Sequence, residues 1–189
     1  RIIGYWNEAG FCNLTPADSP QRELPDFGCW GIAQDRGGEL WFGYYGGYRP
    51  GKVLRYDGRC FPQVGEAEGL PASDLPCALG QDGEGHVWIG RGNQVWRFDG
   101  QQFQSLPPLD LGQGYVRKIQ CDRQGRIWLC TSEGVFWGDV DGFQQFTPRD
   151  GLAHETVNAV WQDREGVFWF ATYGGGICSY DPERLQVFG

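Results

Sequence analysis

The stretch "DREGVFWFA" (163–171) decides the fold, because three other segments of the chain repeat its pattern. Each segment has Asp, two further residues, Gly, one residue, a large apolar residue, Trp, a second large apolar residue and a small residue. The other copies are "DRGGELWFG" (35–43), "DGEGHVWIG" (82–90) and "DRQGRIWLC" (122–130). Successive Trp residues lie 47, 40 and 41 positions apart. Near-constant spacing of this kind indicates a repeat protein.

In each copy, the Asp and the Gly predict a tight turn between two strands. An Asp side chain at the first turn position accepts backbone N–H bonds, and a Gly three residues later adopts a conformation that other residues resist. The residues assigned to this turn and strand are Asp35, Gly38, Trp41, Asp82, Gly85, Trp88, Asp122, Gly125, Trp128, Asp163, Gly166 and Trp169. Each turn has one such acid and no Asp-x-Asp-x-Asp loop occurs, so we interpret the aspartates as turn-forming residues rather than metal ligands.

The strand that carries the Trp is apolar on both faces. In the first copy Trp41 and Gly43 share one face, and Leu40 and Phe42 share the other. Both faces must therefore be buried, and the small residue beside each indole leaves room for a neighbouring sheet. Apolar alternation before each Asp and an aromatic strand after each Trp give four strands per unit. Such a unit of about 40 residues is typical of a β-propeller blade.

The predicted fold is therefore all-β, a β-propeller with four complete four-stranded blades and part of a fifth, in a single region over residues 1–189. The blades are expected at 29–70, 71–110, 111–149 and 150–189, after the end of a preceding blade and a linker at 1–28. The final segment "RLQVFG" (184–189) reads as a fourth strand and does not complete that preceding blade. We expect a fragment of a larger propeller; the alternative is a four-bladed ring with an extra hairpin.

The composition excludes several classes of protein. The 31 glycines and 15% aromatic residues favour short strands joined by tight turns. No apolar run approaches the roughly 18 residues of a membrane span, so no direct membrane insertion of this segment is expected. A net charge of −8 with scattered arginines argues against a nucleic-acid partner, because a phosphate backbone needs a basic stripe.

The seven cysteines form no Cys-x-x-Cys pair, which argues against a structural zinc site. The same spacing of 17 residues separates Cys12 from Cys29 and Cys60 from Cys77, and such a repeated spacing suggests disulfide pairs. Each such pair would join an outer strand to an inner one. Three strand steps of about 4.8 Å exceed the roughly 7 Å that a disulfide tolerates between Cα atoms. We therefore expect free thiols.

Catalytic motifs are weak, and we predict no catalytic residue, no metal and no cofactor. The two histidines, His86 and His154, are far apart in the repeat, and His86 is expected at the surface. The stretch "HETVN" (154–158) lacks the second His of a zinc-protease helix. The glycines of "TYGGG" (172–176) precede a strand, so they indicate a hairpin loop rather than a phosphate-binding loop.

The loops after each second strand and between units should share one face of the propeller, and they carry aromatic and basic residues. The first unit has an insertion there, at 44–52. Aromatic rings beside Arg and amide groups suit sugar or acidic-sugar ligands; the alternative is plain exposed loops or a contact with a further domain. The candidate ligand-binding residues on this loop face are Tyr44, Tyr45, Tyr48, Arg49, Arg91, His154 and Tyr173.

The segment "DGLAHETVNAVWQDREGVFWFATYGGGICSYD" (150–181) resembles the two-component regulator propeller repeats. The resemblance rests on the DGL turn, the Asn-x-Val strand, the Asp-x-x-Gly turn, the Trp strand and the Tyr-Asp of the third strand. It extends over nearly the whole chain and is weakest at 1–28. The second and third units depart from it, with Arg91 where Thr is expected and Cys130 where Gly is expected.

This resemblance implies a non-enzymatic sensor: a ligand-sensing or interaction segment of a bacterial two-component receptor, on the periplasmic or extracytoplasmic side. The implied outputs are a histidine kinase or a diguanylate cyclase. The implied partners are an oligosaccharide or other small ligand, further propeller blades, signalling domains and a second copy in a homodimer. Two alternatives stay open, because a fold hosts many functions: a propeller lyase or hydrolase related to streptogramin lyase, and a protein-interaction scaffold.

Overall fold

The computed structural model describes residues 3–7, 10–14, 28–45, 51–73 and 77–182. These residues form 17 strands and two 3₁₀ turns, η2 (Glu66–Glu68) and η3 (Pro148–Asp150). No helix in these ranges is long and apolar enough to cross a membrane. The fold is all-β, as the sequence predicts.

The strands form three four-stranded sheets, one three-stranded sheet and one hairpin, all antiparallel with neighbours in chain order. The N-terminal hairpin holds β1 (Ile3–Asn7) and β2 (Gly10–Leu14), and the first sheet holds β3 (Gly28–Gln34), β4 (Leu40–Tyr45), β5 (Lys52–Tyr56) and β6 (Gln63–Val64). The second sheet holds β7 (Ala78–Gln81), β8 (Val87–Arg91), β9 (Gln94–Phe98) and β10 (Phe103–Ser105), and the third holds β11 (Val116–Cys121), β12 (Ile127–Thr131), β13 (Gly134–Asp139) and β14 (Gly142–Phe146). The fourth sheet holds β15 (Val157–Gln162), β16 (Phe168–Thr172) and β17 (Ile177–Tyr180). The predicted last strand at 184–189 lies outside the described residues.

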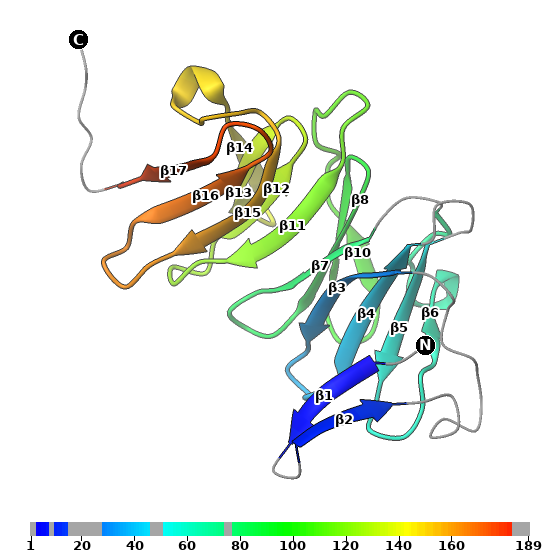
Figure 1. Cartoon of the computed structure of the whole chain (residues 1–189). Helices are drawn as coiled ribbons and strands as arrows, with labels where there is room; N and C mark the ends of the chain where they lie inside the picture. The colour runs from blue at the N-terminus through cyan, green and yellow to red at the C-terminus, as the bar shows by residue number, and fades with distance from the viewer. Residues whose placement is uncertain (1–2, 8–9, 15–27, 46–50, 74–76, 183–189) are drawn as a thin grey trace.

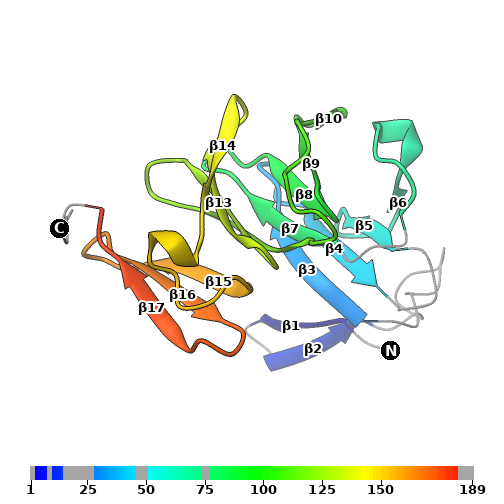
Figure 2. The same ribbon diagram turned by 90° about the horizontal axis from the view of Figure 1, so that it is seen from above.

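The sheets follow one another as propeller blades do. The first strands β3, β7, β11 and β15 each contact the next in the series. Figures 1 and 2 show the four sheets along an arc that is not closed into a ring. The N-terminal hairpin of β1 and β2 is the expected part of a fifth blade.

Apolar clusters fill each interface between successive sheets. At the first, the Trp41 ring lies 4.9 Å from the ring of Phe98 in the next sheet. Trp128 lies 4.2 Å from Phe168 in the same way. A Cβ added to Gly90 would lie 2.7 Å from Cβ of Val116, closer than real side chains approach. Small residues beside each indole therefore permit the close approach of sheets that the repeat pattern predicts.

A hydrogen bond inside each repeat was not foreseen from the sequence. The repeat Asp accepts from the indole Nε1–H of the Trp six residues later, at 2.9 Å for Asp35, 3.0 Å for Asp82, 2.8 Å for Asp122 and 2.6 Å for Asp163. Its other oxygen caps backbone N–H groups of the turn. Each Asp therefore fixes both its turn and the orientation of its own Trp.

The fourth sheet departs from the expectation that both faces are buried. Trp169 is 45% exposed, and its cross-strand neighbour Trp161 and the nearby Ile177 are also exposed. The physical reason is that no sheet among the described residues covers this face. The fourth indole is therefore not wedged between two sheets as the other three are.

The cysteines with described side chains, Cys29, Cys60, Cys77, Cys121, Cys130 and Cys178, are free thiols. Cys60 and Cys77 are therefore not bridged, whereas the side chain of Cys12 lies outside the described residues. Burial between sheets raises the pKa of Cys77 to about 11 and that of Cys130 to about 12, because a thiolate is poorly solvated there.

Candidate binding site at the inner edge of the third and fourth sheets

Two of the predicted loop-face residues are buried. Tyr44 is 4% exposed and packs in a cluster with Phe42, Leu54 and Phe61. Arg91 is also 4% exposed; its Nη1 donates to the Pro71 carbonyl at 2.8 Å, and its Nε is buried without a hydrogen-bond partner in the described part of the chain. Tyr48, Arg49 and the side chain of Tyr45 lie outside the described residues. A ligand role for these five residues stays a prediction.

His154 and Tyr173 are brought together on two neighbouring loops of the fourth sheet. The Tyr173 N–H donates to the Thr156 carbonyl at 2.8 Å, and the Thr156 N–H donates to Nδ1 of His154 at 3.0 Å. A Cβ on Gly175 would lie 2.8 Å from Cβ of His154, so the glycine run lies directly against this histidine. The Tyr173 side chain is exposed and available to a ligand.

Three of the four first strands carry a β-bulge at the same place, at the end nearest the predicted loop face. The register shifts between Cys29 and Gly31 in β3, between Val116 and Lys118 in β11, and between Val157 and Ala159 in β15. A bulge leaves one extra residue outside the ladder and re-aims its side chain, as often happens beside binding sites. The bulged residues are Trp30, Arg117 and Asn158.

Arg117 and Asn158 meet across the interface between the third and fourth sheets. Arg117 Nε donates to Asn158 Oδ1 at 2.9 Å, and Arg117 Nη1 donates to Tyr115 Oη at 2.6 Å. The guanidinium carbon of Arg117 lies 5.3 Å from the centre of the Tyr115 ring. Ser132 Oγ accepts from the Tyr115 N–H at 3.1 Å, which positions the loop. We name Tyr115, Arg117 and Asn158 the inner-edge patch.

The inner-edge patch has the chemistry that the sequence predicts for the loop face, but on different residues. An aromatic ring offers a stacking surface, and an amide offers a donor and an acceptor. A guanidinium whose hydrogen-bond partners here are neutral can form an ion pair with an anionic ligand. A sequence signal for the bulge exists. Val116 and Val157 each lie 12 residues before their repeat Trp, whereas Cys77 lies 11 before Trp88.

The inner-edge patch belongs in part to a segment that matches a family model. Residues 110–133, which include Tyr115 and Arg117, match the model described as two component regulator propeller. The chain carries a two component regulator propeller repeat. This confirms the resemblance noted in the sequence, although the match falls one repeat before the segment at 150–181. None of the curated proteins is significantly similar in sequence.

Solved structures with a similar fold include extracellular domains of putative two component systems and a lyase. The extracellular domain of a putative hybrid two component system from B. thetaiotaomicron aligns with a TM-score of 0.68 and 21% identity, over 94% of this chain and 23% of that one. A second such domain from the same organism aligns with a TM-score of 0.69 and 19% identity, over 94% of this chain and 25% of that one. Virginiamycin B lyase from Staphylococcus aureus aligns with a TM-score of 0.67 and 16% identity, over 95% of this chain and 62% of that one. This chain therefore spans about a quarter of the length of the receptor domains.

In the second sheet, the expectation that His86 is a surface residue is wrong. Its side chain is only 11% exposed, and Nδ1 lies 3.1 Å from Asp82 Oδ1 and 2.6 Å from Nη2 of Arg97. The physical reason is that the Asp82 turn and the Arg97 side chain close over the ring. Within the described ranges, no group of three or more His, Cys, Asp and Glu side chains could hold a metal ion.

Proposed function

We propose that this chain is a ligand-sensing segment of a bacterial two-component receptor, located outside the cytoplasm and without catalytic activity of its own. The ligand class is an oligosaccharide with an acidic group. The observation that carries this proposal is the inner-edge patch, where Tyr115, Arg117 and Asn158 combine a ring, a cation and an amide.

The proposal is supported by the repeat match and by the fold shared with extracellular domains of two component systems. Signalling in this arrangement would require differential affinity. A ligand shifts a receptor between two arrangements only when it binds one of them more tightly. The patch is suited to this because its donors come from two sheets, so a bound saccharide would contact both and favour one relative position of the sheets.

The test is calorimetric titration of the chain with short oligogalacturonides and with neutral oligosaccharides of the same length. We expect saturable binding of the acidic series. Replacing Arg117 by Ala should weaken it at least about tenfold, or about 1.4 kcal/mol, because a charge-assisted hydrogen bond is lost. The matched control is Lys118→Ala, which removes the same charge from the next residue of β11 and should leave binding unchanged.

Two results would overturn the proposal. Equal effects of the Arg117 and Lys118 replacements would reduce the interaction to general charge attraction, and no binding of any saccharide would leave an interaction scaffold. Product analysis of the same mixtures separates the enzyme alternative. Cleavage of the saccharide, or of added virginiamycin B, would replace sensing by catalysis.

A further inference from the structure

At the end of the sheets opposite the inner-edge patch, an arginine bridges the first and second sheets. Arg36 follows the repeat Asp of the first sheet, and its N–H donates to the Gly85 carbonyl of the second at 2.9 Å. Its Nη2 reaches to 3.0 Å from the position that a Cβ on Gly100 would take. The Arg36 side chain therefore fills space between the turn of one sheet and a turn of the next.

The third and fourth sheets are bridged by the arginine at the equivalent position. Arg123 follows Asp122, and its N–H donates to Oε1 of Gln162 at 3.0 Å. Its Nη1 donates to the Arg164 carbonyl at 3.0 Å. The residue after the repeat Asp thus supplies a guanidinium to the next sheet at both of these interfaces.

Between the second and third sheets this residue is Gly83, and no side chain fills the space. A cavity of about 320 Å³ is present there, compared with about 170 Å³ at the first interface, where Arg36 is one of the lining residues. The cavity is lined by the turn at Asp82–Glu84, by Trp88 and Arg97 of the second sheet, and by Gln124, Asp139 and Val140 of the third. We name this cavity the Gly83 gap.

The Gly83 gap has fewer positive charges in its lining than the cavity at the first interface, as expected where an arginine is missing. The cavity at the first interface is lined by two carboxylates, Asp35 and Glu39, and two guanidinium groups, Arg36 and Arg55. The Gly83 gap is lined by three carboxylates and one guanidinium group, that of Arg97. The gap therefore has an excess of negative charge that a cation would balance.

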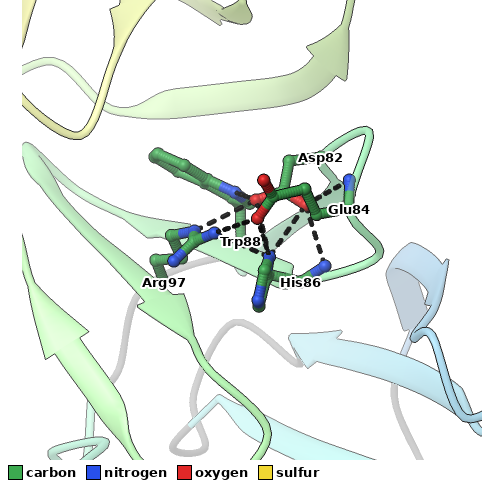
Figure 3. A network of polar contacts seen from close by, with 5 residues as sticks. All are labelled: Asp82, Glu84, His86, Trp88 and Arg97. Atoms are coloured by element: carbon green, nitrogen blue, oxygen red, sulfur yellow. Dashed lines mark hydrogen bonds and ion pairs between the residues drawn. The ribbon is translucent and has the colours of Figure 1, made fainter. Parts of the chain in front are cut away.

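Figure 3 shows that Arg97 is already committed to the second sheet. Its Nε donates to Asp82 Oδ2 at 3.0 Å, and its Nη2 lies 3.3 Å from Glu84 Oε2. Asp82 also accepts from the Trp88 indole at 3.0 Å, so its carboxylate is engaged on both sides. The exposed carboxylates of Glu84 and Asp139 lie on opposite walls of the gap. Glu84 pairs with Arg97 through Oε2, and Asp139 accepts from the Asp141 N–H through Oδ1, so the second oxygen of each carboxylate is the atom placed to receive a ligand.

We propose that the Gly83 gap binds the guanidinium group of a small cationic ligand, in the space that Arg36 and Arg123 occupy at the neighbouring interfaces. A planar guanidinium pairs well with carboxylates, and the exposed carboxylates of Glu84 and Asp139 line the gap. The site does not depend on the saccharide site, since the two lie at opposite ends of the sheets. A bound ligand would join the second sheet to the third as the arginines join the other pairs.

The experiment compares argininamide with citrulline amide, which has the same shape but a neutral urea group. The readout is the indole N–H resonance of Trp88, whose proton is held by Asp82 at the gap. We expect argininamide to shift this resonance saturably. Citrulline amide should bind at least about tenfold more weakly, because it lacks the charge-assisted pairs.

Two variants test the location. Gly83→Arg should abolish binding, because the new side chain fills the gap; a Cβ at Gly83 meets no atom within 4 Å, and its φ is not left-handed. Gly83→Ala is the matched control and should bind as the natural chain does. Asp139→Asn should weaken binding without altering the turn of the second sheet. Equal shifts with both amides, or unchanged binding by Gly83→Arg or Asp139→Asn, would overturn the proposal.

Discussion

Trp128 and Trp169 occupy the same position in neighbouring repeats but lie in different environments. Each donates its indole proton to the Asp six residues earlier, at 2.8 and 2.6 Å. Trp128 is 2% exposed against Phe168 and Phe170 of the next sheet, whereas Trp169 is 45% exposed. The indole–carboxylate bond is therefore a local property of one hairpin, and burial of the indole depends on the sheet that follows.

The largest expected difference between the two sites comes from truncating the indoles. Trp128→Ala should lower the free energy of unfolding by about 3–5 kcal/mol, the usual cost of truncating a buried large aromatic. Trp169→Ala should lower it by about 1 kcal/mol or less, because the side chain has little packing to lose. Urea denaturation measures both. Losses of equal size would mean that the third interface does not depend on the Trp128 wedge.

A smaller difference is expected for the aspartates. The Asp122 side chain is 1% exposed and accepts from Trp128 Nε1 at 2.8 Å and from Arg126 Nε at 2.7 Å. Asp122→Ala leaves the buried indole N–H of Trp128 without this acceptor and should cost about 2–3 kcal/mol.

The equivalent change at the open face, Asp163→Ala, should cost less in the same denaturation experiment, because water replaces the lost acceptor. Asp122→Asn is the control, since it retains one acceptor oxygen. An equal cost at the two sites would contradict the distinction between the covered and the open repeat.

The smallest effect concerns pH. Burial raises the pKa of the Asp82 carboxyl, but hydrogen bonds from the Trp88 indole, the His86 amide and Arg97 outweigh it, and the pKa is lowered overall. The pKa of Asp163 is lowered too, first by the Trp169 indole. A lowered pKa stabilises the fold above the ordinary value of about 3.9, and the gain is lost as pH falls through the lower folded value.

Asp82→Asn should therefore flatten the fall in melting temperature between about pH 4 and pH 2. Asp163→Asn should flatten it less, because its turn is open to water. The measurement is thermal unfolding by circular dichroism across this range. An unchanged pH profile in the Asp82 variant would show that its hydrogen bonds do not favour the ionised form.

The architecture was readable from the sequence because it depends on features with fixed spacing. The Asp and Gly of each turn, the Trp, and the small residue two positions after it recur with a period that no single-copy fold would show. The hydrogen bond from the Trp128 indole to Asp122 joins residues at an equally regular spacing. It could not be predicted, because side-chain alternation alone does not give the orientation of the indole relative to the turn.

The sequence predicts for the loop face the same ligand chemistry that we propose for the inner-edge patch, but it points to other residues. Loop position suggested Tyr44 and Arg91, but Tyr44 is buried in an apolar cluster of the first sheet, and Arg91 is buried and donates to the Pro71 carbonyl. Arg117 and Asn158 were missed because an ordinary strand would alternate them regularly, whereas a bulge turns each out of the ladder. The blade limits and a ligand role for the seven loop-face residues stay predictions: Tyr44, Tyr45, Tyr48, Arg49, Arg91, His154 and Tyr173.

The bond between each Asp and its own Trp has a consequence for how such chains grow. Because the hydrogen bond between Asp and Trp lies within one hairpin, a duplicated repeat carries its own turn geometry and its own Trp with it. Duplication then adds one interface and leaves the internal bonding of earlier repeats unchanged. A gain or loss of a whole repeat then changes the number of sheets along the arc, while each new unit remains free to diverge at its bulge and at the residue after its Asp.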